Sequence, residues 1–195
     1  MRSLPMRVKL RIVAGSLRGR KLNCDVSGKL RPAPQMVREA LFSILGNAVP
    51  GRTFYDLFAG TGAVGLEALS RGASSVVFLE RDVRHAARIQ EHLEEFEVTD
   101  QARVQRSDVY RFVERWQPPN ESVNIFMGPP FIDLTERFDE LLAAVASLQS
   151  KSPPGTVIVL QTENNFAEDQ LPEHAAWDIR KYGRNMLFIW VKSED

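Results

Sequence analysis

Residues 56–65 read DLFAGTGAVG, and this stretch decides the fold. The apolar run 53–58 that enters it is typical of a buried strand. Gly60 and Gly62 allow the chain to turn tightly and to come close to a ligand. The helix that follows would point its free N–H groups at the same place. The stretch therefore predicts a strand, a ligand-binding turn and a helix, in that order.

Strand and helix patterns alternate on both sides of this stretch. Strands are expected at 53–58, 75–80, 103–106, 123–127 and 156–161, and helices at 35–47, from the glycine turn to 71, and at 82–96, 108–116 and 134–148. Residues 177–181 and 186–191 predict two further strands joined as a hairpin. The alternation predicts an α/β fold with a seven-stranded, mostly parallel sheet that ends in a C-terminal antiparallel hairpin.

Acidic residues follow the first three strands of this predicted sheet. Asp56 ends the first strand, Glu80 ends the second, and Asp108 follows the third. Ligands of such sheets bind beyond the carboxyl ends of the strands, so we expect the three acids in one site. Glu80 can accept both hydroxyls of a ribose, and Asp108 can accept from an adenine amino group while Val109 packs on the ring. Asp56 is suited to hold an ammonium group.

The glycines also fit the G-x-G-x-x-G fingerprint of dinucleotide-binding enzymes. NAD would place a pyrophosphate on the turn, whereas an acid before the glycines and another after the third strand favour an adenosyl ligand with an amino-acid end. A dehydrogenase would also need a hydride-transfer apparatus. The three histidines offer none, because we expect His85 and His92 in a polar helix and His174 in a loop, all at the surface.

The fourth strand is followed by Gly128-Pro129-Pro130-Phe131. The two prolines fix an extended and rigid backbone, which leaves the preceding carbonyls aimed at the pocket. Phe131 offers a flat face on which a base can stack. The segment therefore predicts a pocket for a base that has left its stack.

Charge is distributed unevenly along the chain. The 195 residues carry no net charge at pH 7, but residues 1–34 hold nine Lys or Arg and one acid, a net charge of +8. A basic arm on an acidic body is typical of a polyanion binder. We therefore predict that residues 1–34, the N-terminal arm, are a basic extension that binds nucleic acid, attached to a catalytic domain at 35–195.

The single cysteine, Cys24, excludes an internal disulfide and a cysteine-based zinc site, and it suits a reducing compartment. No apolar run approaches the ~20 residues of a membrane helix, and the N-terminus lacks the pattern of a signal peptide. We expect a cytoplasmic protein with no metal ion and no membrane anchor.

Several motifs together resemble one family. They are RIVAG at 11–15, RGRKL at 18–22, RP at 31–32, VREALF at 37–42, DLFAGTG at 56–62 and GLEALSRGA at 65–73, followed by the acids and the Pro-Pro-Phe segment. These motifs resemble the RsmD family of bacterial 16S rRNA guanine-N2 methyltransferases, from about Arg11 to Lys192. The resemblance implies a Rossmann-like class I methyltransferase, S-adenosyl-L-methionine as cofactor, 16S ribosomal RNA or the small ribosomal subunit as partner, and a monomer.

The resemblance and the strand-end pattern together assign three groups of residues. The expected cofactor-binding residues are Asp56, Phe58, Ala59, Gly60, Thr61, Gly62, Glu80, Arg81, Asp108 and Val109. The expected catalytic residues are Gly128, Pro129, Pro130 and Phe131. The expected RNA-binding residues of the N-terminal arm are Arg11, Arg18, Arg20, Lys21 and Arg31.

Two positions depart from the family pattern. Asp or Asn usually precedes the Pro-Pro pair, where this chain has Gly128. Two Thr and an Asp usually follow the Arg-Pro pair, where this chain has Ala33, Pro34 and Gln35. A guanine amine is a poor nucleophile and needs an acceptor for its N–H. Losing one such group typically slows transfer ~10²–10³-fold.

Three hypotheses follow from Gly128. Transfer proceeds slowly on the Gly128 and Pro129 carbonyls, another acid substitutes (Asp133 is the nearest in sequence), or the chain binds cofactor and RNA without transferring a methyl group. A DNA amino-methyltransferase using the same pocket is a further alternative, although no separate sequence-reading domain is visible.

Overall fold

A seven-stranded sheet forms the centre of the computed structural model, which describes residues 6–26, 32–163 and 166–194. The strand order is β5-β4-β3-β6-β7-β9-β8. The first five strands in this order are parallel, and β9 pairs antiparallel with both β7 and β8. The predicted mostly parallel sheet with a closing hairpin is therefore confirmed. The bounds are β3 (Thr53–Leu57), β4 (Ser75–Leu79), β5 (Ala102–Gln105), β6 (Asn124–Met127), β7 (Val157–Glu163), β8 (Asp178–Tyr182) and β9 (Asn185–Val191).

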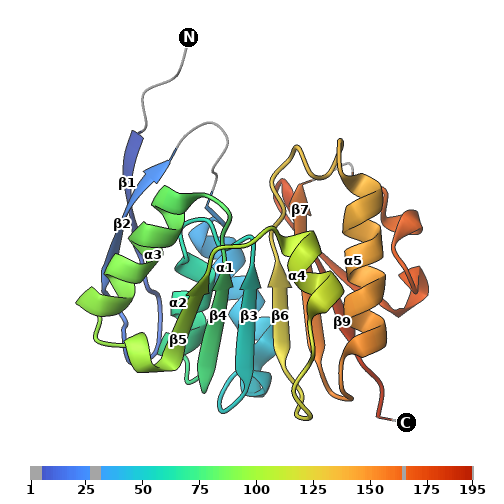
Figure 1. Ribbon diagram of the computed structural model, residues 1–195, viewed down its shortest axis with the longest axis horizontal. Coiled ribbons are helices and arrows are strands. Elements are labelled where there is room, and N and C mark those ends of the chain that lie inside the picture. The colour runs from blue at the N-terminus through green and yellow to red at the C-terminus, as the bar shows by residue number, and fades with distance from the viewer. Residues whose placement is uncertain (1–5, 27–31, 164–165, 195) are drawn as a thin grey trace.

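Helices cover the two faces of this sheet unequally (Figure 1). Helices α1 (Gln35–Leu45), α2 (Ala63–Ser70) and α3 (Val83–Glu95) share one hydrophobic cluster on the back face. Helices α4 (Val109–Arg115) and α5 (Phe138–Lys151) share the other cluster on the front. Short 3-10 turns lie at Gly46–Ala48, Thr99–Gln101, Glu168–Gln170 and His174–Ala176. Within the described ranges, no helix is long and apolar enough to span a bilayer.

The side-chain patterns explain these elements. Every residue of β6 is buried, as expected for a central strand that is covered on both faces. Helix α3 is amphipathic, because Ala86, Ile89 and Leu93 recur at helical spacing and are buried. Its first turn is capped by Asp82, whose carboxylate accepts from the backbone N–H groups of Arg84 and His85 at 2.8 and 3.3 Å.

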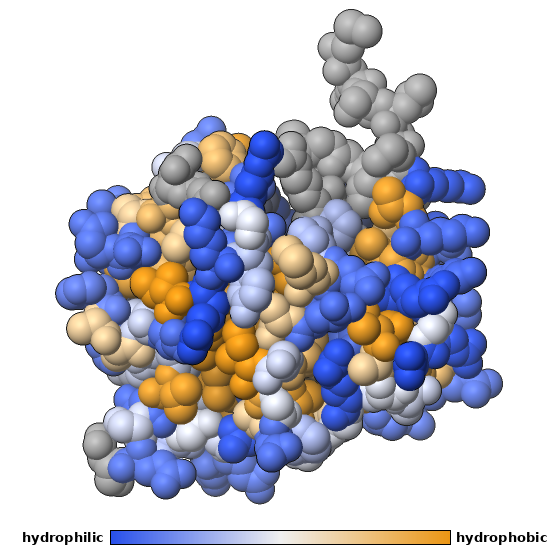
Figure 2. Space-filling view, turned by 180° about the vertical axis from the view of Figure 1, so that it is seen from behind, coloured by the Kyte–Doolittle hydropathy of each residue, from blue (hydrophilic) through white to orange (hydrophobic). Residues whose placement is uncertain are grey.

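The N-terminal arm contains an antiparallel hairpin that the sequence did not predict. Strands β1 (Met6–Arg11) and β2 (Lys21–Val26) pair with Lys9 opposite Asn23 and Arg11 opposite Lys21. Leu22 and Cys24 are buried, whereas the basic residues Arg7, Lys9, Arg11 and Lys21 alternate with the inward side chains and are exposed. Seen from behind, hydrophilic side chains project from the edge of the molecule where this hairpin lies (Figure 2). The hairpin therefore presents a basic outer face.

Buried polar side chains of α2 fasten the turn of this hairpin to the body. The Glu67 carboxylate is fully buried and accepts from the backbone N–H groups of Val13 and Ala14 at 2.8 and 3.1 Å. The Ser70 hydroxyl accepts from the backbone N–H of Leu17 at 2.9 Å and donates to the Ala14 carbonyl. These bonds give hydrogen-bond partners to backbone donors that would otherwise be buried without one. The segment from Val13 to Leu17 is therefore attached to the body of the protein.

Arg38 of α1 makes a second connection to the arm. Its guanidinium is 1% exposed and donates to the backbone carbonyls of Arg11 and Ala33, both at 2.9 Å. Burial lowers the pKa of this guanidinium, and the nearby Glu67 carboxylate opposes that shift.

Two local expectations were wrong. The helix expected at 134–148 begins only at Phe138, because residues 130–136 form successive turns that bring the Asp133 side chain inside. His92 is buried instead of exposed, since its ring packs against Phe96 with the centroids 6.0 Å apart. Burial lowers the pKa of His92, so the neutral imidazole is the form that this packing favours.

Candidate active site

The strand order reverses between β3 and β6. The chain runs from β3 outward to β4 and β5, then returns to β6 on the other side of β3. In sheets of this kind ligands bind at such a point, beyond the carboxyl ends of the strands. The residues predicted to bind and react follow these strand ends, which places them along one edge of the sheet.

Asp56 is 1% exposed and lies beneath the glycine turn. Its Oδ2 accepts from the backbone N–H of Gly65 at 2.9 Å and so ties the end of β3 to the first turn of α2. Burial raises the pKa of Asp56 to about 8. The neighbouring Glu80 adds to this shift, and the hydrogen bond from Gly65 opposes it. A cation that binds beside this carboxyl group favours loss of its proton and is stabilised by the carboxylate that results.

The raised pKa predicts how stability depends on pH. Unfolded Asp56 loses its proton near pH 3.8, whereas the folded side chain keeps it to about pH 8. Folding therefore takes up a proton in this window, and stability falls as pH rises, by at most about 1.4 kcal/mol per pH unit. In urea unfolding between about pH 5 and about pH 8, the wild-type protein should lose stability relative to the Asp56→Asn variant. Parallel curves would contradict the assignment.

Glu80 connects the glycine turn to the start of α3. Its Oε2 accepts from the backbone N–H of Gly60 at 2.8 Å, and its Oε1 accepts from that of Asp82 at 2.7 Å. An ionised carboxylate has about four acceptor positions, so each oxygen can still accept a second donor such as a ribose hydroxyl. Glu80 therefore fits the role predicted for it.

The two carboxylates distinguish between the two possible ligands of the turn. A pyrophosphate needs free backbone N–H groups and positive potential, but the N–H groups of Gly60 and Gly65 already donate to Glu80 and Asp56. The Glu80 carboxylate at the turn also repels a second anion. The site instead fits a ligand with a positively charged end and ribose hydroxyls. S-adenosyl-L-methionine, with its ammonium and sulfonium groups, has this chemistry.

Phe58 departs from ordinary backbone geometry at the end of β3. Its φ is 67°, in the left-handed region that non-glycine residues rarely adopt, at a typical cost of about 1–3 kcal/mol. The ring makes an edge-to-face contact with Tyr110 of α4, with centroids 5.9 Å apart. The conformation aims the chain from β3 toward the glycines, and the aromatic contact helps to hold it there.

Asp108 begins α4 and is fully engaged within the protein. Its Oδ1 accepts from the backbone N–H groups of Tyr110 and Arg111, and its Oδ2 forms an ion pair with Arg137 at 2.8 Å. Burial acts to raise the pKa of Asp108, but the hydrogen bonds from Arg137 and from the backbone lower it overall. An adenine amino group that donates to Asp108 would thus be an additional donor to a carboxylate that already accepts from the helix N-terminus and from Arg137.

The Pro-Pro-Phe segment leaves β6 as a loop that passes into turns at Phe131. Pro129 is buried, whereas Phe131 is 69% exposed, so its ring is available to a base. A Cβ added at Gly128 would lie 3.2 Å from the nearest ring atom of Phe126, which is tight but needs only a small movement of that ring. A Cβ at this position therefore fits once the Phe126 ring gives way slightly.

Asp133, the acid considered as a substitute for the missing one, is turned into the protein. It is 1% exposed, and its Oδ2 accepts from the Tyr110 hydroxyl at 2.8 Å. Burial and this hydrogen bond raise the pKa of Tyr110, so the tyrosine stays a donor. Arg137 lies over the Tyr110 ring, 4.1 Å from its centroid. We interpret Asp133 as a residue that positions the loop on α4.

The other predicted residues fall into two groups. Thr61 and Val109 are buried and Arg81 is exposed at the same edge of the sheet, while Ala59 donates its backbone N–H to the Leu79 carbonyl at 2.8 Å. In the arm, Arg11, Arg18, Arg20 and Lys21 are exposed, and Arg31 lies outside the described residues.

Sequence reasoning missed Tyr110, Arg137 and Glu67, because their partners are 23 to 54 residues away along the chain.

Comparison with known proteins gives a consistent result. Residues 10–191 match the family described as Conserved hypothetical protein 95. Ribosomal RNA small subunit methyltransferase D of Haemophilus influenzae is 35% identical over 159 residues, which is 80% of each protein.

Two solved structures place the fold. A hypothetical protein of Thermus thermophilus superposes with a TM-score of 0.72 at 33% identity, covering 93% of this chain and 99% of that one. The 16S rRNA N2 G1207 methyltransferase RsmC of the same organism, solved with AdoMet and guanosine, gives 0.73 at 27% identity and covers 97% and 51%. The fold is therefore that of the class I methyltransferases.

Proposed function

Because the chain belongs to the Conserved hypothetical protein 95 family, which is the RsmD family, we propose that it methylates the exocyclic N2 of a guanine in 16S rRNA, with S-adenosyl-L-methionine as methyl donor. The observation that carries the proposal is the pair of buried carboxylates, Asp56 and Glu80, on the glycine turn. They suit a cationic adenosyl ligand, and the Pro-Pro-Phe segment lies at the same edge of the sheet.

The residues divide the work between cofactor and base. S-adenosyl-L-methionine supplies an electrophilic methyl group carried by a sulfonium sulfur. Asp56 is placed to hold its ammonium group and Glu80 to accept its ribose hydroxyls. Phe131 offers its exposed face to the target base, which must first leave its stack.

The amine is held by the backbone after β6. The Pro130 carbonyl already accepts from the backbone N–H of Asp133 at 2.9 Å, which leaves the Gly128 and Pro129 carbonyls as acceptors for the guanine N–H. An acceptor at this place relieves the positive charge that builds on nitrogen during transfer. Without a side chain at 128, positioning contributes most of the acceleration, and transfer is slow.

The proposal is tested with tritium-labelled cofactor and undermethylated small-subunit particles, followed by mapping of the methylated nucleotide. Transfer to a guanine N2 is expected, together with calorimetric binding of S-adenosyl-L-methionine and its demethylated product but not of NAD. Binding of cofactor and particle without transfer would overturn the proposal in favour of a non-catalytic RNA-binding protein. Transfer to DNA instead of RNA would contradict the proposal that 16S rRNA is the substrate.

The N-terminal arm is proposed to hold the RNA. Charge reversal of Arg18, Arg20 and Lys21, which are exposed at the hairpin, should weaken RNA binding about tenfold or more and flatten its salt dependence. Cofactor affinity should not change. Reversal of Arg180 and Lys181, exposed on β8 at the far edge of the sheet, is the matched control. Equal RNA binding by the arm variant and wild type at every salt concentration would refute this role.

We also propose that the protein acts as a cytoplasmic monomer. A catalytic site that draws all its predicted residues from one chain needs no partner copy. Sedimentation at concentrations used for the transfer assay should give the mass of one chain, and a stable dimer would contradict this part of the proposal.

A further inference from the structure

A cleft of about 560 Å³ lies on the front of the sheet, away from the glycine turn. Its floor is the row formed by Tyr55 of β3, Val77 of β4 and Arg103 of β5, which are direct neighbours in the sheet. Its wall is α4 and the residues just after it. In Figure 1 the front of β4 and β5 has no helix over it, and β5 is the edge strand. The cleft is therefore open along the edge of the sheet.

Three arginines line this cleft: Arg103 from β5, and Arg111 and Arg115 from α4. All three are exposed, and none forms an ion pair with any residue of the described ranges. No carboxylate from the described part of the chain lines the cleft. We name this feature the arginine cleft. Three cations without a counter-charge fit an anionic ligand, and guanidinium groups match phosphate geometry well.

Aromatic side chains form the other part of the lining. The Tyr55 ring lies 5.5 Å from Trp116 and 6.3 Å from Phe112, measured between centroids. Trp116 is 6% exposed, and its indole Nε1 has no hydrogen-bond partner among the described residues. Proteins that bind single-stranded nucleic acids combine aromatic faces, on which bases stack, with arginines that contact the phosphates.

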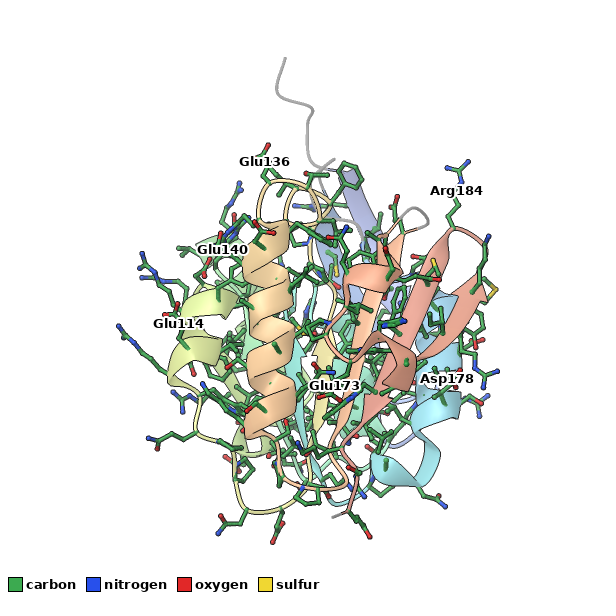
Figure 3. The ribbon with its side chains drawn as sticks, turned by 90° about the vertical axis from the view of Figure 1, so that its right-hand side faces the viewer. Glu114, Glu136, Glu140, Glu173, Asp178 and Arg184 are labelled. Atoms are coloured by element: carbon green, nitrogen blue, oxygen red, sulfur yellow. The ribbon has the colours of Figure 1, made fainter. Side chains whose placement is uncertain are left out.

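The opposite flank of the site carries carboxylates, and the arginine between them is held in ion pairs. Glu136 and Glu140 lie at the upper end of α5, next to the loop from β6 (Figure 3). Arg137 between them is engaged by Glu140 and Asp108, with N–O distances of 2.7 and 2.8 Å. A polyanion that reaches the Pro-Pro-Phe segment is therefore favoured to leave over α4, toward the arginine cleft.

From these observations we propose that the arginine cleft binds a nucleotide of single-stranded RNA, with its phosphate on Arg103, Arg111 and Arg115 and its base against the aromatic wall. The proposal rests on the proposed function, because the RNA is the methylation substrate. The cleft is a contact for a flanking nucleotide, separate from the pocket of the target base.

The distance between the two places suits one RNA strand. Ser107 lines the cleft and directly precedes Asp108 at the cofactor edge. Tyr110, in the first turn of α4, holds the loop that carries Phe131, whereas Arg115 ends the helix. At 1.5 Å per residue this helix is about 10 Å long, so neighbouring nucleotides of one strand can span it.

The test uses the whole protein and a short oligouridylate, with tryptophan fluorescence as the readout. Trp116 lines the cleft, whereas Trp177 and Trp190 lie near each other with their ring centroids 6.5 Å apart. Oligouridylate should quench fluorescence saturably, and the signal should vanish in Trp116→Phe.

Replacing Arg103, Arg111 and Arg115 by Gln should weaken binding about tenfold or more and reduce the salt slope by about 2. Replacing Arg180 by Gln on β8 is the control.

The outcomes separate this proposal from the proposed function. If the triple variant keeps the oligouridylate affinity and the salt slope of the wild type, the proposal that the cleft binds RNA is overturned. This holds even if methyl transfer to particles proceeds normally. Tighter binding of uridine monophosphate than of oligouridylate also overturns it, in favour of a free nucleotide as ligand. Loss of oligouridylate binding in the triple variant supports the cleft whether or not the wild type transfers a methyl group.

Discussion

Replacing Gly128 by Asp is expected to raise the rate constant of methyl transfer about 10²-fold. The carboxylate would add a side-chain acceptor for the guanine N–H to the backbone carbonyls that follow β6. The added Cβ would lie 3.2 Å from one atom of the Phe126 ring and 3.5 Å from another, so the variant requires a small movement of that ring. Single-turnover transfer of labelled methyl to small-subunit particles measures the change.

Gly128→Ala is the matched control, because it adds the same Cβ beside Phe126 without an acceptor. Its rate constant should stay at or below that of the wild type. Cofactor affinity should be similar in all three proteins, since the change concerns the base and not the glycine turn. A Gly128→Asp variant no faster than Gly128→Ala would show that the missing side chain does not limit transfer.

Removing the Glu67 side chain is expected to destabilise the protein by about 3–5 kcal/mol and to release the N-terminal arm. In Glu67→Ala the backbone N–H groups of Val13 and Ala14 lose their acceptor, and Arg71 loses a carboxylate 2.9 Å away. Urea unfolding measures the stability. Trypsin should cut faster after Arg18 and Arg20, and RNA affinity should fall while the cofactor still binds.

Two further variants make this result specific. Glu67→Gln keeps one carbonyl oxygen as an acceptor and should lie between wild type and Glu67→Ala. Glu91→Ala removes an exposed carboxylate that pairs with Arg88 at 2.6 Å on α3, and it should change stability by less than about 1 kcal/mol. An intact, trypsin-resistant arm in Glu67→Ala would contradict the anchoring role.

Much of the site could be predicted because its residues follow strands that are easy to recognise. The glycine turn with Asp56, the acid Glu80 and the Pro-Pro-Phe segment come directly after apolar runs, and parallel strands bring their carboxyl ends to one edge. The contacts between side chains inside the site could not be predicted in this way. Neither the contact of Tyr110 with Asp133 nor that of Arg137 with Asp108 has a local pattern, since the residues lie 23 and 29 positions apart.

The sequence by itself determined the order of strands and helices along the chain, the edge of the sheet where the predicted site residues lie and the basic character of the arm. These follow from short-range periodicity and charge. Only the tertiary structure decided that the arm is a hairpin fastened by Glu67, that Asp133 points inward, and that three arginines from β5 and α4 share one cleft. These features depend on which surfaces meet after the chain has folded. Burial and distance between remote residues carry no signature in the local order of side chains.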